Sequence, residues 1–215
     1  MRNEWVSMSA SALVTGAMTL LLGSLLNPTS GATDPTETLH VVQENSARWM
    51  AVAVLFFIAS VALTLGLPAV LTLFTRRGRS LGYLAVGVFS IGTIGTSGYA
   101  MLMVFFRALV DEEALRPGLL AAVTQDSGFL AFIYVWAGCF YLGLLLLAFA
   151  LFAAKRTPAW IPVLLLVFVA MFPVSTSTGL VGMAVQLMLL AVAFTGVAIS
   201  ATTPRESERL SDANV

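Results

Sequence analysis

Charged residues are scarce in this chain of 215 residues. They make up 10% of the sequence, whereas hydrophobic residues make up 59% and the mean hydropathy is +0.93. A soluble domain carries about 25% charged residues, because charged side chains cover a surface that faces water. The composition therefore excludes an ordinary soluble domain. Basic and acidic residues number 11 each, so no basic excess favours binding of nucleic acid.

Cysteine and histidine are almost absent, with a single residue of each, Cys139 and His40. One cysteine excludes an intrachain disulfide and a metal site built from several cysteines. Cys139 lies in an apolar run, where we expect it to act as a small buried hydrophobic side chain. The middle of every long apolar run lacks Asp, Glu, Lys, Arg and His. That absence argues against a proton-coupled transporter, a pump or a voltage sensor.

Charge-free runs are the strongest feature that the sequence does contain. They cover residues 5–33, 49–75, 80–106, 127–154 and 157–204. A bilayer core about 30 Å thick needs roughly 20 apolar residues in a helix. The last run is more than twice that long, so it must turn, and Pro173 followed by the polar residues of 174–179 predicts where.

The sequence thus predicts an all-α, polytopic membrane bundle of six transmembrane helices. The expected spans are residues 6–26, 49–74, 80–106, 128–154, 159–174 and 180–202. Residues 1–204 would form this single domain, and residues 205–215 a short polar tail in the cytoplasm.

Basic residues are distributed unevenly between the loops. With six crossings, eight basic residues lie on the side of both termini and three on the other side. The eight are Arg2, Arg76, Arg77, Arg79, Lys155, Arg156, Arg205 and Arg209, and the three are Arg48, Arg107 and Arg116. Cytoplasmic loops carry such an excess, so we expect both termini in the cytoplasm. A cleaved signal peptide ending near residues 30–32 is the alternative for the first run, whose apolar stretch exceeds the usual signal core of about 7–15 residues.

Three local motifs predict further structure. Asp34, Pro35 and Glu37 form a capping box with proline at the first helical position, which predicts a helix beginning near Pro35 and bending near Ser46. Pro68 predicts a kink in the second span, where the Thr64 hydroxyl could compensate the lost backbone bond. The apolar residues 119–123 predict a helix along the membrane surface.

The third span is unusually rich in small residues. Eight of the twelve residues from 87 to 98 are Gly, Ser or Thr, namely Gly87, Ser90, Gly92, Thr93, Gly95, Thr96, Ser97 and Gly98. Small side chains let helix backbones approach closely in lipid. We therefore expect Gly92, Thr93, Thr96 and Ser97 to be buried against at least two other spans, with this helix at the centre of the bundle.

Polar and aromatic side chains within the spans offer the few candidates for a binding site. Gln186 is the most polar residue in the middle of a span, and we expect it to hydrogen-bond a neighbouring helix, with Gly182 on the same face allowing close approach. Binding a polar group of a substrate is the alternative for Gln186. Tyr134, Trp136 and Tyr141 are expected to pack into the bundle, and lining a ligand pocket is their alternative role.

Motifs for catalysis are missing. The spacing of Glu37 and His40, with Glu44 one turn further on, resembles half of a di-iron carboxylate site, but the other inward-facing carboxylates are not available, so we expect a solvated helix. The sequence has no Gly-x-Ser-x-Gly elbow and no Gly-x-x-x-x-Gly-Lys loop. We therefore expect no enzymatic activity, no cofactor and no bound metal.

The layout of the chain resembles a known group of proteins. A first span precedes an external loop that ends in a helix, Arg48-Trp49 opens the second span, and Leu67-Pro68 precedes Arg76-Arg77-Gly78-Arg79 at its end. This plan is similar to that of small bacterial six-span integral membrane proteins of the domain-of-unknown-function type. The resemblance covers most of the chain and rests on layout and common dipeptides. It implies a bacterial inner-membrane location and no particular activity.

Three functions remain as hypotheses. The leading one is a non-catalytic accessory, regulatory or scaffold protein that packs against other membrane proteins, and it predicts a bundle without a polar central cavity. The second is a carrier or channel for small neutral or lipid-like molecules, with hinges at Pro68 and at the glycines of the third span. The third is an enzyme acting at the outer interface through His40, Glu44 and the acidic residues of the second external loop.

Overall fold

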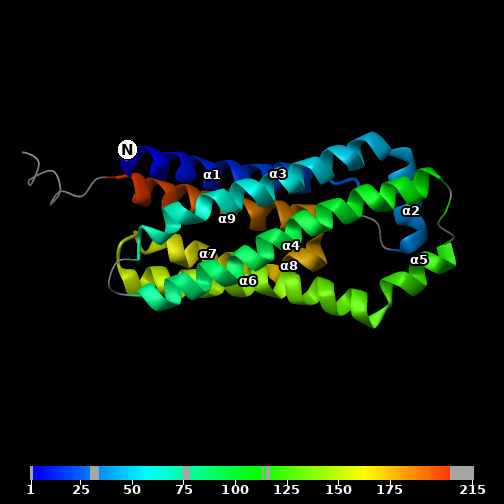
Figure 1. Ribbon diagram of the computed structural model, residues 1–215. Helices are drawn as coiled ribbons and strands as arrows, with labels where there is room; N and C mark the ends of the chain where they lie inside the picture. Colours follow the sequence, from blue (N-terminus) through cyan, green and yellow to red (C-terminus); the bar gives the residue numbers. More distant parts are fainter. Residues whose placement is uncertain (1, 30–33, 75–77, 113, 115–116, 204–215) are drawn as a thin grey trace, which may run out of the picture.

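The computed structural model describes residues 2–29, 34–74, 78–112, 114 and 117–203 (Figure 1). Within these residues the regular secondary structure is all helical, and no strand is present. The nine helices are α1 (Arg2–Leu26), α2 (Pro35–Glu44), α3 (Ser46–Leu71), α4 (Arg79–Asp111), α5 (Pro117–Thr124), α6 (Ser127–Ala154), α7 (Trp160–Ala170), α8 (Phe172–Thr178) and α9 (Leu180–Thr202). The predicted cleavage site at residues 30–32, the Arg76–Arg77 pair and the tail of residues 205–215 lie outside the described ranges.

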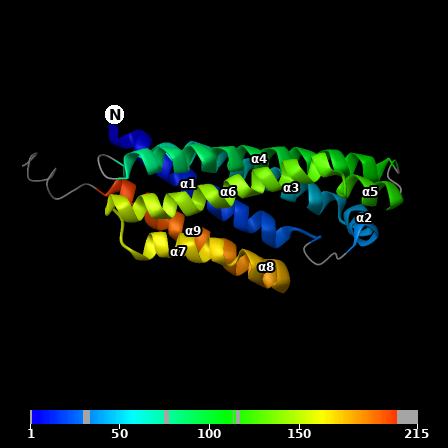
Figure 2. The same ribbon diagram turned by 90° about the horizontal axis from the view of Figure 1, so that it is seen from below.

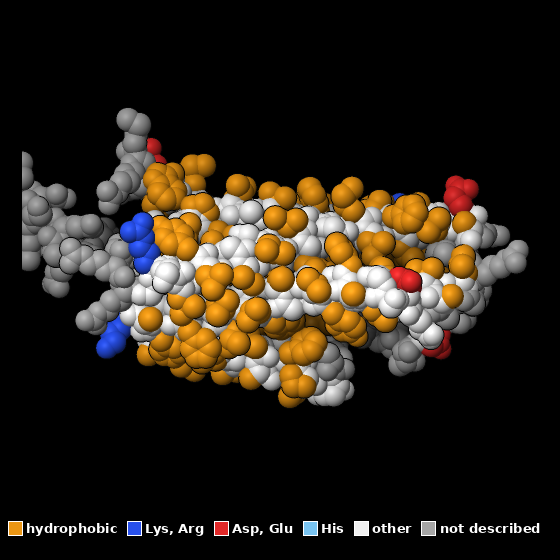
Figure 3. Space-filling model, turned by 60° about the horizontal axis from the view of Figure 1, so that its bottom comes forward, with side chains coloured by type: hydrophobic (Ala, Val, Ile, Leu, Met, Phe, Trp, Pro, Cys, Tyr) orange, Lys and Arg blue, Asp and Glu red, His pale blue; other side chains and the backbone are white. Residues whose placement is uncertain are grey.

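Five helices are long and apolar enough to cross a membrane, namely α1, α3, α4, α6 and α9. Hydrophobic side chains cover the middle of the face seen in Figure 3, and charged side chains lie toward its two ends. This distribution is that of a multi-pass membrane protein. The remaining apolar helix, α7, has 11 residues and is too short to cross by itself.

The fifth predicted span ends later than the sequence suggested. Helix α7 is followed after Met171 by α8, which continues to Thr178, and the chain turns at Gly179 with a φ of 63°. The turn thus lies at the end of the predicted range of residues 173–179, and residues before it are helical, because Pro173 stands in the first turn of α8, where its missing N–H costs no helical bond. The Ser177 and Thr178 hydroxyls donate to the Val174 carbonyl and support that helix.

The connection between the first two spans agrees with the sequence. Asp34 is the N-cap of α2, and its carboxylate accepts a hydrogen bond of 2.8 Å from the Glu37 N–H. Helix α2 ends at Asn45, and α3 starts at Ser46, so the predicted bend is confirmed. Helix α5 contacts α2 and α6, which caps one end of the bundle with two short helices. We call this the α2–α5 end, and the end where α1 begins and α9 finishes the terminal end.

The long helices pack in a closed ring. Helix α1 lies beside α3, α3 beside α4, α4 beside α6, α6 beside α7, α7 beside α9, and α9 beside α1 (Figures 1 and 2). At the terminal end Ala10, Ala69 and Ala198 bring α1, α3 and α9 together. Further along, Phe89 of α4 and Phe194 of α9 meet with ring centroids 5.8 Å apart, which fills the interior.

The α1–α3 contact depends on two glycines. A Cβ atom on Gly16 would lie 2.7 Å from the Leu63 nitrogen, and one on Gly66 would lie 2.6 Å from the Leu13 Cα. Real Cβ atoms do not approach backbone atoms so closely, so any larger residue would force the two helices apart. Close packing of this kind replaces the hydrophobic drive that is lacking between helices in lipid.

This close approach lets α1 repair the proline kink of α3. The Ser9 hydroxyl donates to the Leu65 carbonyl at 2.7 Å and accepts from the Ala69 N–H at 3.0 Å. The hydroxyl group is therefore inserted between a donor and an acceptor that would bond directly in an unbroken helix. Because Ser9 is only 7% exposed, lipid or water cannot take its place. A neighbouring helix thus bridges the backbone groups of Leu65 and Ala69, which flank Pro68.

Replacing Ser9 by Ala should lower the free energy of unfolding by about 1–3 kcal/mol, because the buried Ala69 N–H would lose its acceptor. Unfolding in detergent, followed by circular dichroism, measures this change. Ser7→Ala is the matched control, since Ser7 is exposed on the same helix, and it should leave stability unchanged. Equal stability of the two variants would show that the Ser9 bridge contributes nothing.

Candidate functional site

Hydroxyl groups join α3 to α4 in the middle of the bundle. The Ser60 hydroxyl donates to the Thr93 carbonyl at 2.5 Å, and the Thr64 and Thr93 hydroxyl oxygens lie 3.1 Å apart. Thr64 also donates to the Ser60 carbonyl at 2.8 Å. The prediction that Thr64 compensates the Pro68 kink is therefore wrong, because its hydroxyl faces α4 while Ser9 occupies the kink.

The small residues of α4 also allow contact with α6. A Cβ on Gly92 would lie 2.5 Å from both the Cα and the nitrogen of Phe140, and one on Gly95 would overlap the Trp136 ring. The Trp136 indole N–H donates to the Gly92 carbonyl at 2.7 Å. In the same way, a Cβ on Gly143 of α6 would lie 2.5 Å from the Phe89 Cα of α4. The two helices thus interlock through glycines on both sides.

The predicted packing residues of α4 fall on the side that faces α3 and α6. Gly92, Thr93 and Thr96 are buried, whereas Ser97 is half-buried and donates to the Ile94 carbonyl of its own helix. The prediction that α4 is central is wrong, because the ring leaves its other side exposed. Nothing lies within 4 Å of a Cβ built on Gly87 or Gly98. Bulky neighbours such as Ile91, Ile94 and Met101 are more than half exposed on that side.

Gln186 joins α9 to α7. Its side chain is 3% exposed, and its amide N–H donates to the Phe168 carbonyl at 2.8 Å. One turn earlier, a Cβ on Gly182 would clash with the Thr178 hydroxyl and lie 2.9 Å from the Ser175 Cα. Gln186 and Gly182 therefore hold α9 tightly against the α7–α8 segment.

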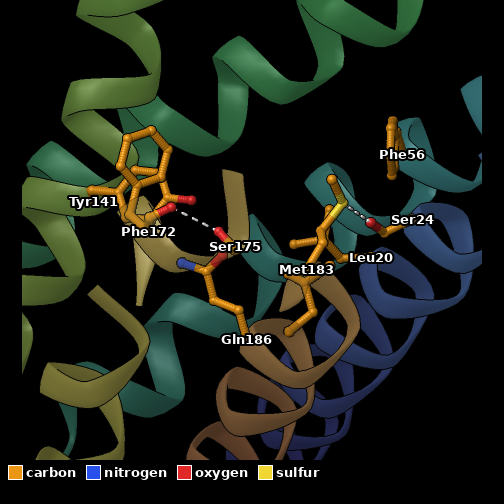
Figure 4. Close-up of a pocket in the computed structure, with 9 residues that line it drawn as sticks. Leu20, Ser24, Phe56, Tyr141, Phe172, Ser175, Met183 and Gln186 are labelled. Carbon is orange, nitrogen blue, oxygen red and sulfur yellow. Dashed lines mark hydrogen bonds between the residues drawn. The ribbon is translucent and has the colours of Figure 1, made fainter. Parts of the chain in front are cut away.

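A cavity of about 230 Å³ lies directly beside Gln186 (Figure 4). Its walls come from α1, α3, α6, α8 and α9. The lining residues are Leu20, Ser24, Phe56, Tyr141, Phe172, Ser175, Met183, Gln186 and Leu187. The cavity interrupts the packed interior that the leading sequence hypothesis predicted.

Aromatic rings form one side of this cavity. Tyr141 of α6 makes an edge contact with Phe172 of α8, with centroids 4.8 Å apart, and stacks on Phe168 of α7 at 5.6 Å. Tyr141 therefore has both roles considered for it, packing and lining a pocket. Tyr134, by contrast, is 69% exposed on α6, so its predicted burial in the bundle is wrong.

The polar groups of the cavity are neutral and already engaged. The Ser24 hydroxyl donates to the Met183 sulfur, and the Ser175 hydroxyl donates to the Phe172 carbonyl of its own helix (Figure 4). None of the nine lining residues carries an ionisable acid or amine. The cavity can therefore accommodate an apolar molecule with a small neutral polar group, but it provides no nucleophile activated by a base and no ligand set for a metal.

The acidic and histidine residues of the loops do not assemble into a site. Glu37, His40 and Glu44 are exposed on α2. Among the residues that the structure describes, no group of three His, Cys, Asp or Glu side chains could hold a metal ion. Asp111 forms an ion pair of 3.2 Å with Arg107 one turn earlier on α4. Apart from its polar residues, the cavity has no signal in the sequence, because most of the helices that line it are distant in the chain.

Replacing Gly92 by Ala should lower the free energy of unfolding by about 1–3 kcal/mol, because the new methyl group collides with the Phe140 backbone. Gly98→Ala is the matched control on the open side of α4, where alanine favours a helix by about 0.5–1 kcal/mol over glycine. Thermal unfolding of both variants in detergent measures the difference. If Gly92→Ala is as stable as Gly98→Ala, the α4–α6 contact is not as close as described.

Comparison with known proteins adds no template for this arrangement. No family model, curated protein or solved structure matches the chain.

Proposed function

We propose that this chain is a six-span, non-catalytic protein of a bacterial inner membrane that serves as an accessory, regulatory or scaffold component for another membrane protein. In this proposal α7 and α8 together form the fifth span. Their residues 160–178 correspond to a length of about 28 Å in a helix, close to the thickness of the bilayer core. The terminal end would then face the cytoplasm.

The distribution of charge supports this orientation. Arg79, Lys155 and Arg156 lie at the terminal end, and the Arg156 guanidinium donates to the Thr72 carbonyl there at 3.4 Å. The acidic residues of the α2–α5 end include Asp34, Glu37, Glu44, Asp111 and Asp126. Basic residues favour the cytoplasmic side of short loops.

The non-catalytic proposal rests on one observation, that the polar side chains inside the bundle form hydrogen bonds between helices. Ser9, Ser60, Trp136 and Gln186 each donate to a backbone carbonyl of a neighbouring helix. A catalytic or proton-carrying group in a membrane protein is typically ionisable and faces the bundle interior. In this bundle the interior polar groups are neutral, and their hydrogen bonds hold helices together.

The cavity beside Gln186 favours a second candidate function, a binding protein or carrier for small neutral or lipid-like molecules. Its lining is mostly apolar, and its polar groups are two hydroxymethyl groups, a phenol and an amide. Such a pocket selects against charge, because a charged group would lose its hydration without gaining a partner. Binding here is compatible with a regulatory role as well as with transport.

Cysteine accessibility in intact cells tests the orientation. In a Cys139→Ala background, Glu37→Cys should react with a membrane-impermeant maleimide, because it lies at the α2–α5 end, which we assign to the outside. Lys155→Cys should react only after the membrane is permeabilised. The opposite pattern would reverse the assignment, and reaction of both in intact cells would contradict a single orientation.

Photocrosslinking in native membranes tests the accessory role. A photoreactive phenylalanine analogue at Phe105, which is 61% exposed on α4, should crosslink to one membrane protein in constant proportion. The analogue at the buried Phe89 should crosslink only within this chain. Purified protein in proteoliposomes should show no flux of neutral solutes. Flux that saturates with solute, together with crosslinks to lipid alone, would reject the accessory role in favour of a carrier.

A further inference from the structure

The ring is closed less tightly around the cavity than elsewhere. Helix α6 packs against α4 and α7, yet among the described residues no Cα atom of α6 lies within 8 Å of one in α8 or α9. Helix α8 follows α7 directly after Met171, and the turn at Gly179 starts α9 directly afterwards. The wall between α6 and α8 is therefore made by side chains alone.

Two aromatic side chains make that wall. The Tyr141 and Phe172 rings meet edge to face across it. Phe172 lines the cavity and is at the same time 48% exposed on the outside of the bundle. The cavity is partly open to the surface, and Phe172, on a short helix, narrows that opening. A rotamer change of Phe172 would widen the opening sideways without any movement of the long helices.

The depth of the opening determines which molecules can reach it. Gln186 is six residues after the start of α9, which corresponds to about 9 Å along the helix. If α9 is the sixth span, as proposed above, the opening faces lipid hydrocarbon rather than water. The cavity volume of about 230 Å³ is below the roughly 300–1,000 Å³ of sites that enclose a whole small molecule. It suits part of a long molecule, whose remainder stays outside.

We propose that the cavity holds the end of one acyl chain of a bilayer lipid, which enters between α6 and α8 past Phe172. This inference rests on the second candidate function and names its ligand class. The chain end packs against Leu20, Phe56 and Leu187, while the lipid headgroup stays at the surface of the α2–α5 end. The neutral lining excludes the charged headgroup from the cavity.

A lipid with a diazirine at the end of one acyl chain tests the proposal directly. The protein is reconstituted in vesicles of phosphatidylglycerol that contain a small fraction of this probe, irradiated, and mapped by tandem mass spectrometry. Labelling should be several-fold higher at Tyr141 and Met183, which line the cavity, than at Met188, which is 55% exposed on α9. Equal labelling of cavity and surface residues would overturn the proposal.

A substitution that fills the cavity gives a second test of lipid binding. Leu187→Phe adds volume inside it and should reduce labelling of Tyr141 several-fold, whereas Met188→Phe, its exposed neighbour, should not. Both variants are checked for folding by gel filtration and thermal unfolding, and Ser24→Val replaces Leu187→Phe if the latter is unstable. Undiminished labelling in a folded, cavity-filled variant would reject the site.

A long-chain alcohol with the same terminal diazirine separates a bilayer lipid from a free amphiphile. Competition by unlabelled phosphatidylglycerol should lower labelling of Tyr141 by both probes. Labelling by the alcohol alone would overturn the assignment to a lipid. None of these failures bears on the accessory role, because that role is judged by crosslinks from Phe105 and by solute flux.

Discussion

Every polar group inside an apolar bundle must find its partner within the protein, because lipid offers none. The structure meets this constraint with bonds that run between helices. Ser9 completes the kinked backbone of α3, Ser60 and Thr93 join α3 to α4, and Trp136 joins α6 to α4. Gln186 does the same between α9 and α7. These bonds determine which helices can be neighbours and in what register.

Such bonds are short, so they require helices that approach closely. Gly16 and Gly66 permit this between α1 and α3, and Gly92 and Gly143 permit it between α4 and α6. Elsewhere in the ring Ala10, Ala69 and Ala198 bring α1, α3 and α9 together, and Gly182 brings α9 against α8. Among the described residues no Cα atom of α6 lies within 8 Å of one in α8, and the cavity lies between these two helices. The close contacts of the ring thus follow the position of its small residues.

The sequence predicted the helices better than their arrangement. The charge-free runs located α6 and α9 to within one residue, and the Asp34 motif located α2. Hydropathy does not indicate which side chains form hydrogen bonds between helices. The sequence therefore suggests Thr64 near Pro68, whereas the hydroxyl that bonds to the backbone there belongs to Ser9. The small residues of α4 suggested packing on both sides, yet Gly87 and Gly98 remain open. The cavity could not be predicted, because it depends on which helices are not in contact, and hydropathy carries no information about contacts between helices.

Amide hydrogen exchange across residues 65–70 of α3, in detergent or nanodiscs, tests most directly the claim that bonds between helices satisfy the polar groups of the bundle. If Ser9 completes the Pro68 kink, the Ala69 amide should exchange as slowly as the Leu63 amide within the regular part of the same helix. Exchange of the Ala69 amide that is faster by orders of magnitude, with Leu63 protected, would contradict the account.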